Sequence, residues 1–262
     1  MSEGAGAEKS FWEHLDDLRG CLLKILVAVA VLTVVAFIAK EPLFAIVLAP
    51  QRDSFITYRL LDRIASLWGS GAGSFSVSLI NTGLTRQFMV HMTTAFYAAL
   101  LCTSPYIIYQ LFRFVSPALY VNEKRYARKA VTYGYLLFWI GILVGYFLLF
   151  PLTFRFLGTY QVSGEVVNLI SLQSYMDTLM VLLLLMGLLF ELPLLCCLFA
   201  RMGLLTADFM RRYRRHALVV IFIVAAIITP TADAFTLMAV ALPIYLLWEG
   251  SIFLVKRQEK RG

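Results

Sequence analysis

The stretch LLLLMGLLFELPLLCCLF, residues 182–199, decides the fold of this chain. Its apolar residues continue for nearly the ~20 residues that a helix needs to cross a lipid bilayer. Glu191 is its only charged residue, and a charge at bilayer depth costs at least about 2.5–3.5 kcal/mol on insertion scales. We therefore expect Glu191 to face other helices or a wet cavity. Pro193 lacks a backbone donor and is expected to kink this helix.

The composition extends this interpretation to the whole chain of 262 residues. It is 60% hydrophobic and 15% charged, whereas soluble domains average about 25% charged residues. The fold class is therefore all-α, a single membrane domain over residues 1–262. The apolar runs predict six transmembrane helices, over residues 21–39, 88–112, 130–157, 174–200, 217–230 and 234–255.

The distribution of basic residues predicts the orientation. Of the 23 Lys and Arg residues, 17 lie on one side. They belong to the N-terminal arm (1–20) with the first turn of the first span, to the loops 113–129 and 201–216, and to the C-terminal tail. This asymmetry places both termini in the cytoplasm. The basic excess is therefore topological: it faces anionic membrane lipids and gives no support for nucleic-acid binding. Residues 40–87, which include the amphipathic piece FITYRLLDRIASLW, are expected to form an extracytoplasmic cap.

The arm carries acid where basic residues are usual. In SFWEHLDDLR, residues 10–19, Ser10 and Glu13 form a capping-box pattern, so a helix is expected to begin at Phe11. Its apolar side chains share one face, which predicts an amphipathic helix lying at the inner membrane surface. Asp16 has Arg19 three residues later, whereas Asp17 has Gly20 and Cys21 at the corresponding positions.

A second acid, Glu123, lies in the loop after the second span. Tyr126 and Ala127 stand three and four residues after it. One interpretation is a solvated carboxylate near a helix N-terminus, which the helix dipole favours. The other joins Glu123 with Asp17: two carboxylates beside the membrane suit a paired cation, above all two guanidinium groups, each matching a carboxylate with parallel hydrogen bonds.

Several motifs resemble those of the TatC family, the receptor component of the twin-arginine protein translocase. They are HLDDLR (14–19), FRFVSPALYVNEKR (112–125), FPL (150–152), FELP (190–193), ITP with Asp233, and LPIYLLWE (242–249). The resemblance covers nearly the whole chain. It implies a glove-shaped bundle of six helices, and Asp17 and Glu123 each taking one arginine of a twin-arginine signal peptide. The family usually has Glu where this chain has Asp17.

The resemblance implies further roles. Arg19, Phe114 and Pro117 belong to the motifs around the signal-peptide site, although helix packing, a helix stop or a positive-inside anchor explains them equally well. Glu191 would meet a partner helix or the inserted signal peptide; a structural hydrogen bond is the alternative. The last two spans would dock single-helix TatA- or TatB-like subunits. The candidate contact residues are Thr229, Asp233 and Thr236. Asp233 is also expected to cap the sixth helix.

The expected function is that of a non-enzymatic receptor in the bacterial inner membrane. With partner subunits and other copies of itself, it would export folded proteins using the protonmotive force. A proton-coupled secondary transporter with Glu191 as its proton site is the alternative, but the inverted repeats typical of such proteins are not visible. The sequence has neither H-E-x-x-H nor G-x-S-x-G. Its cysteines have no metal-site or disulfide spacing, so neither a metal nor a cofactor is expected.

Overall fold

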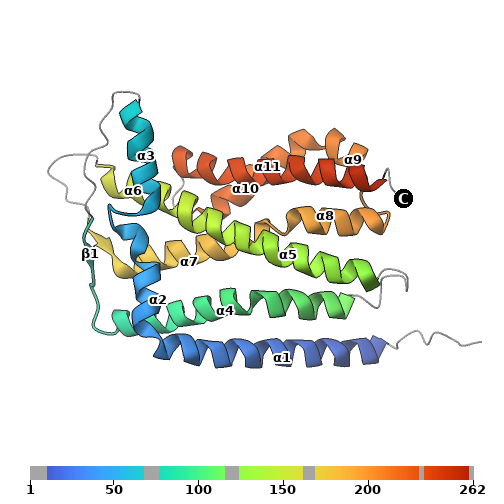
Figure 1. The fold of residues 1–262 in the computed structure, drawn as a ribbon, viewed down its shortest axis with the longest axis horizontal. Coiled ribbons are helices and arrows are strands. Elements are labelled where there is room, and N and C mark those ends of the chain that lie inside the picture. Colours follow the sequence, from blue (N-terminus) through green and yellow to red (C-terminus); the bar gives the residue numbers. More distant parts are fainter. Residues whose placement is uncertain (1–10, 68–76, 116–123, 162–168, 230–232, 260–262) are drawn as a thin grey trace, which may run out of the picture.

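The computed structural model describes residues 11–67, 77–115, 124–161, 169–229 and 233–259. Their long helices lie roughly side by side along one axis (Figure 1). The elements are α1 (Phe11–Ile38), α2 (Lys40–Val47), η1 (Ala49–Gln51), α3 (Ile56–Leu67), β1 (Leu79–Ile80), α4 (Arg86–Val115), α5 (Lys124–Val144), η4 (Gly145–Leu149), α6 (Phe150–Thr159), β2 (Ile170–Ser171), α7 (Leu172–Leu189), α8 (Leu192–Arg201), α9 (Ala207–Arg212), α10 (Arg214–Ile228) and α11 (Ala234–Glu259).

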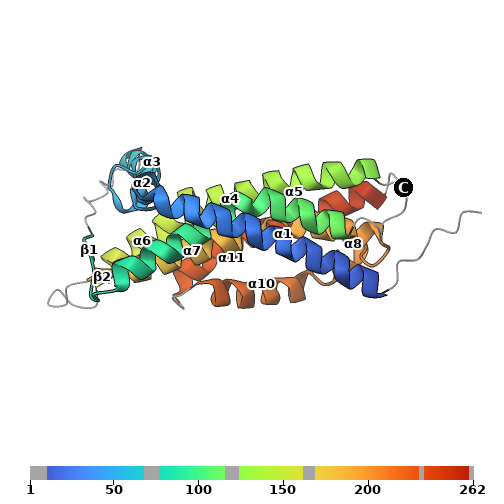
Figure 2. The same cartoon turned by 90° about the horizontal axis from the view of Figure 1, so that it is seen from below.

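In the described part of the chain, six rods, each a helix or a run of consecutive helices, lie along this axis: α1, α4, α5 with η4 and α6, α7 with α8, α10, and α11. The shorter helices α2, α3 and α9 are not counted among them. Four of them are long and apolar enough to cross a membrane by length and composition, over Leu15–Ile38, Val131–Thr159, Leu172–Arg201 and Ala234–Glu259. The rod α4 has the length but carries several threonines and Gln110. The rod α10 has 15 residues, or about 22 Å of helix, and it lies on one face of the bundle (Figure 2).

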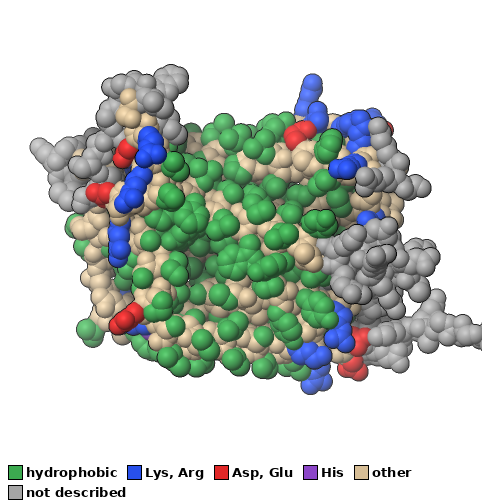
Figure 3. Space-filling model, in the orientation of Figure 1, with side chains coloured by type: hydrophobic (Ala, Val, Ile, Leu, Met, Phe, Trp, Pro, Cys, Tyr) green, Lys and Arg blue, Asp and Glu red, His purple; other side chains and the backbone are tan. Residues whose placement is uncertain are grey.

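The surface of the bundle has the polarity of a membrane protein. Figure 3 shows a broad band of hydrophobic side chains across the middle, with charged side chains gathered at the two ends. We call the end at which α1 begins the arm end, and the end that carries α2 and α3 the cap end. A band that exposes Leu, Val, Ile and Phe so widely is stable in hydrocarbon, where these side chains need no water. The chain is an all-α membrane protein.

The arm does not form a separate surface helix. Helix α1 begins at Phe11 and continues to Ile38 without interruption, so its first residues are collinear with the span and cannot lie flat on the membrane. The single Gly20 does not break the helix, because an isolated glycine costs a helix only about 1 kcal/mol. The sequence prediction of a surface-lying arm is therefore wrong. Phe11 is the first described residue and is already helical, so a helix start at Phe11 stays a prediction, and Ser10 lies outside the described residues.

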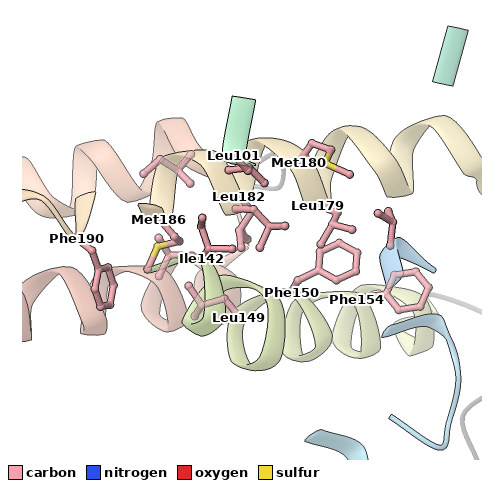
Figure 4. Packing of buried hydrophobic residues seen from close by; sticks show 14 of the residues in the cluster. Leu101, Ile142, Leu149, Phe150, Phe154, Leu179, Met180, Leu182, Met186 and Phe190 are labelled. Carbon is pink, nitrogen blue, oxygen red and sulfur yellow. The ribbon is translucent and has the colours of Figure 1, made fainter. Parts of the chain in front are cut away.

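The core lies where α5, η4, α6 and α7 meet. Figure 4 shows Ile142, Leu149 and Phe150 pointing toward Leu179 and Met186 from the facing helix. Two glycines let the backbones approach: a Cβ added at Gly141 would lie 2.5 Å from the carbonyl oxygen of Met186, and one at Gly187 would lie 2.8 Å from the ring of Phe138. Small residues at such positions are the usual device for close helix packing in membranes.

The fourth rod is broken where the sequence predicts a kink. Helix α7 ends at Leu189, and α8 begins at Leu192 with Pro193 in its first turn. Glu191 occupies the N-cap position between them. Proline is favoured in the first turn of a helix because its missing N–H has no intrahelical partner there. The predicted kink is confirmed.

The segments that precede α4 and α7 contact each other at the cap end. Strands β1 and β2 pair in parallel, Leu79 with Ile170 and Ile80 with Ser171. Arg86 at the start of α4 donates a hydrogen bond to the side-chain oxygen of Gln173 in α7. The loops before α4 and before α7 are therefore joined to each other.

Candidate functional site

The two motifs that the sequence analysis assigns to signal-peptide binding lie at the same end of the bundle. Helix α1 packs along α4, and α1 begins at the end where α4 stops and α5 starts (Figure 1). Asp17 and Arg19 are exposed on the first turns of α1, and Phe114 is half-buried in the last turn of α4. Pro117 and Glu123 lie outside the described residues. The arm motif thus lies at the same end of the bundle as the end of α4 and the start of α5.

An apolar hollow adjoins the acidic residues of the arm. Its volume is about 310 Å³, and its described lining residues all come from α1: Leu15, Leu18, Arg19, Leu22, Leu23 and Leu26. Asp16 and Asp17 are exposed in the same turns of α1. A charged surface and an apolar surface are therefore placed directly next to each other on α1.

Glu191 points at the third rod. A Cβ added to Gly134 in α5 would lie 3.0 Å from Oε2 and 3.4 Å from Oε1 of Glu191. Its Oε1 atom is buried and has no hydrogen-bond partner in the described part of the chain. The sequence prediction that Glu191 faces another helix is confirmed, because Gly134 leaves room for its carboxylate. The orphaned oxygen can accept a hydrogen bond from a group that the chain itself does not supply.

The three residues predicted to dock partner subunits lie near the α10–α11 connection: Thr229 directly after α10, Asp233 directly before α11, and Thr236 in the first turn of α11. The Asp233 carboxylate accepts a hydrogen bond from the backbone N–H of Thr236 over 2.7 Å, so its predicted role as the cap of α11 is confirmed. The side chains of Thr229 and Thr236 are 5% and 0% exposed. Thr229 donates to the carbonyl oxygen of Ala225 over 3.0 Å.

Both threonine side chains therefore lie inside this chain and not on its outer edge. The exposed part of that edge is apolar, and its large members are Val219, Val220, Ile223, Ile227, Met238, Leu242 and Leu246. A partner that docks there meets these side chains first.

A group of tyrosines that the sequence did not indicate holds the cap on the bundle. Tyr146 donates to the carbonyl oxygen of Ile46 over 2.6 Å, and Tyr175 donates to that of Val47 over 3.0 Å. The hydroxyl of Tyr58 lies 3.0 Å from the carbonyl oxygen of Pro50 and 3.2 Å from that of Pro151. A tyrosine near a span end usually indicates an interfacial anchor, so the pattern alone does not reveal these contacts.

An ion pair joins the last two rods. Glu249 in α11 pairs with Arg214 at the start of α10 over 2.6 Å, although Lys256 and Arg257 follow Glu249 in its own helix. This ion pair crosses between the last two rods at the arm end. Only the arrangement of α10 against α11 brings the two residues together.

A comparison with protein families agrees with this arrangement. The family described as Sec-independent protein translocase protein (TatC) matches residues 13–243. The chain belongs to the TatC family. It is 30% identical to the TatC protein of Blattabacterium sp. subsp. Periplaneta americana over 94% of this chain and 95% of that protein. It is 34% identical to TatC of Desulforapulum autotrophicum over 94% of this chain and 84% of that protein.

Solved structures of the TatC family share the fold. A crystal structure described as the twin-arginine translocase receptor TatC in DDM superimposes with a TM-score of 0.76 and 29% sequence identity. The match covers 93% of this chain and 99% of that one. The curated relative TatCy of Bacillus subtilis is 30% identical over 97% of this chain and 92% of that protein. The family match alone, over residues 13–243, runs from the first turns of α1 through the cap and into α11.

Proposed function

We propose that this chain is the receptor subunit of a twin-arginine translocase in the bacterial inner membrane, with both termini in the cytoplasm. It binds the twin-arginine signal peptides of folded cargo proteins at the arm end. It then works with single-helix TatA- or TatB-like subunits and other copies of itself, and the protonmotive force drives export. Family membership supports this function and does not favour the secondary transporter that uses Glu191.

One observation carries the assignment of the binding site. The exposed acids of the arm lie at the end of the bundle where α4 ends and α5 begins. Asp17 and Glu123 each receive one arginine, with Asp16 close enough along α1 to share the cation. Arg19, Phe114 and Pro117 shape the surroundings of the two carboxylates. A guanidinium–carboxylate pair can form two parallel hydrogen bonds, which distinguishes arginine from lysine.

The hollow beside the acids supports a binding direction. A signal peptide has its paired arginines followed by an apolar stretch. With the arginines on Asp17 and Glu123, that stretch would lie along Leu18, Leu22 and Leu26 and enter the membrane beside α1. Deeper in the bundle, the orphaned oxygen of Glu191 is available to a polar group of the inserted peptide or of a partner helix.

Site-specific photo-crosslinking in membranes tests this function. Probes at positions 17 and 123 are expected to crosslink a signal peptide with two arginines, and the crosslinks are expected to fade when both arginines become lysines. A probe at Ile38, exposed at the other end of α1, is the matched control and should not crosslink. Labelling at positions 17 and 123 that ignores the arginines would reject the assigned site.

A further inference from the structure

The outward face of α3 exposes apolar side chains that the described part of the chain does not cover. Ile56 and Leu60 lie one helical turn apart and are 56% and 54% exposed. On the opposite face, Thr57 and Tyr58 are buried against the bundle. The cap is therefore already held by one face of α3, and the ridge formed by Ile56 and Leu60 has no role in holding it.

Two arginines flank this ridge. Arg59 and Arg63 are exposed, four residues apart, on the side of α3 next to Ile56 and Leu60. Among the described residues, no ion pair involves either arginine, whereas Asp62 is paired with Arg155 in α6 over 3.4 Å. A helix with apolar side chains beside long basic ones is typical of helices that lie in a membrane interface, where the basic groups reach the headgroups.

The position of α3 suits such an interface. It runs across the long axis of the bundle and lies about level with the end of α1 in both views (Figure 1, Figure 2). Helix α1 ends at Ile38, and the exposed charges of Lys40 and Glu41 follow directly. The hydrocarbon region therefore ends at this level, and α3 lies parallel to its surface.

The start of α3 lies against the apolar band of the bundle. Thr57 donates a hydrogen bond to the carbonyl oxygen of Phe147 in η4. The ring of Phe55, directly before α3, stacks on the ring of Phe147 at 5.6 Å. Phe147 and Leu148 are exposed large hydrophobic residues of that band. Helix α3 thus begins at the edge of the lipid-facing surface.

We infer that α3 is an anchor that binds anionic phospholipids in the leaflet at the cap end. Ile56 and Leu60 insert among the upper acyl chains, and Arg59 and Arg63 bind lipid phosphates. The position of α3 at the edge of the apolar band favours lipid over a soluble protein, and the two cationic groups select anionic headgroups. This role is separate from signal-peptide binding, which occurs at the arm end.

Fluorescence quenching in vesicles tests the insertion. An environment-sensitive fluorescent amino acid is placed at position 60, at position 66 on another side of the same helix, or at position 88, an exposed residue at the start of α4. The full chain is reconstituted in phosphatidylcholine with phosphatidylglycerol. Position 60 should be quenched by brominated lipid and protected from aqueous iodide, and position 66 should show the reverse. Equal iodide quenching at both positions would place the ridge in water, open to a protein partner, and overturn the inference.

The same probes test the choice of headgroup. At position 60, brominated phosphatidylglycerol should quench more than brominated phosphatidylcholine, since each basic residue near an anionic surface contributes about a fivefold preference. Arg59→Gln with Arg63→Gln should bring this quenching ratio close to one. The ratio at position 88 should not change, and size-exclusion chromatography checks that the variant is folded. An unchanged ratio at position 60 would show that the arginines bind no phosphate.

Discussion

The hydroxyl of Tyr58 in the cap lies 3.2 Å from the carbonyl oxygen of Pro151 in the bundle, although 93 residues separate the two. The ring of Tyr58 also lies under the guanidinium of Arg155, 5.7 Å from its carbon to the ring centre. Two further tyrosine hydroxyls, of Tyr146 and Tyr175, donate to the carbonyls of the last two residues of α2, Ile46 and Val47. Such terminal carbonyls have no partner within their own helix. The cap is thus held by tyrosine hydroxyls that donate to carbonyl oxygens in both directions, from cap to bundle and from bundle to cap.

Replacing Tyr58 with Phe should loosen the cap. The variant keeps the buried ring but leaves the carbonyls of Pro50 and Pro151 without their donor, and an unsatisfied buried acceptor costs about 1–3 kcal/mol. We expect the free energy of unfolding in detergent micelles to fall by that amount. Tyr133→Phe, at an exposed position, is the control and should change it little. A Tyr58→Phe protein as stable as the wild type would mean that the contact adds nothing.

The buried hydroxyl of Tyr58 should also make the folded chain less stable at alkaline pH. Burial raises the pKa of Tyr58 above its usual value of 10.0, so the folded chain holds this proton more tightly than the unfolded chain does. Its contribution is complete below pH about 10 and decreases as the pH rises further, by up to about 1.4 kcal/mol per pH unit. Melting temperatures measured from pH 8 to 11 should therefore converge for wild type and Tyr58→Phe. Curves that remain parallel would contradict this.

The close approach of α5 and α7 predicts a strong effect of a single methyl group. In Gly141→Ala the new Cβ would lie 2.5 Å from a backbone oxygen, so the helices must separate, and overpacking of this kind costs about 1–3 kcal/mol. Gly250→Ala is the matched control, because nothing lies within 4 Å of its Cβ. Alanine there should stabilise α11 by up to about 1 kcal/mol. Melting temperatures in detergent compare the two, and equal shifts would refute the proposed packing.

Two substitutions of Asp233, the N-cap residue of α11, can distinguish its effect on stability from an effect on partner docking. Asp233→Ala removes the oxygen that accepts from Thr236 and should lower the free energy of unfolding by about 0.5–2 kcal/mol. Asp233→Asn retains an oxygen acceptor and should be nearly as stable as the wild type. If the negative charge docks a partner subunit, the Asn variant alone should be stable yet export less cargo. Export that follows stability in both variants would leave Asp233 with the capping role only.

The sequence predicts most of the fold because the length of each hydrophobic run is a local property of the chain. The kink at Pro193 and the orientation of Glu191 toward another helix also follow from local rules, since a proline removes a donor and a buried acid must avoid lipid. The straight α1 was not predicted, because an amphipathic pattern in the arm fits either a surface helix or the first turns of a span. Only the unbroken hydrogen bonding through Gly20 decides between them.

Contacts between distant residues escape this kind of reasoning. The pair of Arg214 with Glu249 crosses two helices, and the tyrosines that hold the cap reach carbonyls, which leave no trace in the sequence. The burial of Thr229 and Thr236 is equally invisible, since a threonine near a helix end fits both a surface and an interior position. Helix packing, and not residue type, decides these three features.

Asp17 gives the sharpest prediction for function. A carboxylate that receives a guanidinium forms a charge-assisted bond worth about 1.5–3 kcal/mol, so Asp17→Asn should weaken binding of a twin-arginine peptide about 10- to 100-fold. Asp17→Glu should preserve binding, because it keeps the charge and extends the side chain by one methylene. Asp16→Asn, on the same exposed turn, should weaken binding less than Asp17→Asn, because Asp16 only shares the cation. Fluorescence anisotropy with the chain in nanodiscs measures all three variants against peptides with RR or KK. Loss of affinity in Asp16→Asn alone would mean that Asp16, and not Asp17, binds the arginine. Equal affinity for the RR and KK peptides would mean that no carboxylate of the arm recognises arginine.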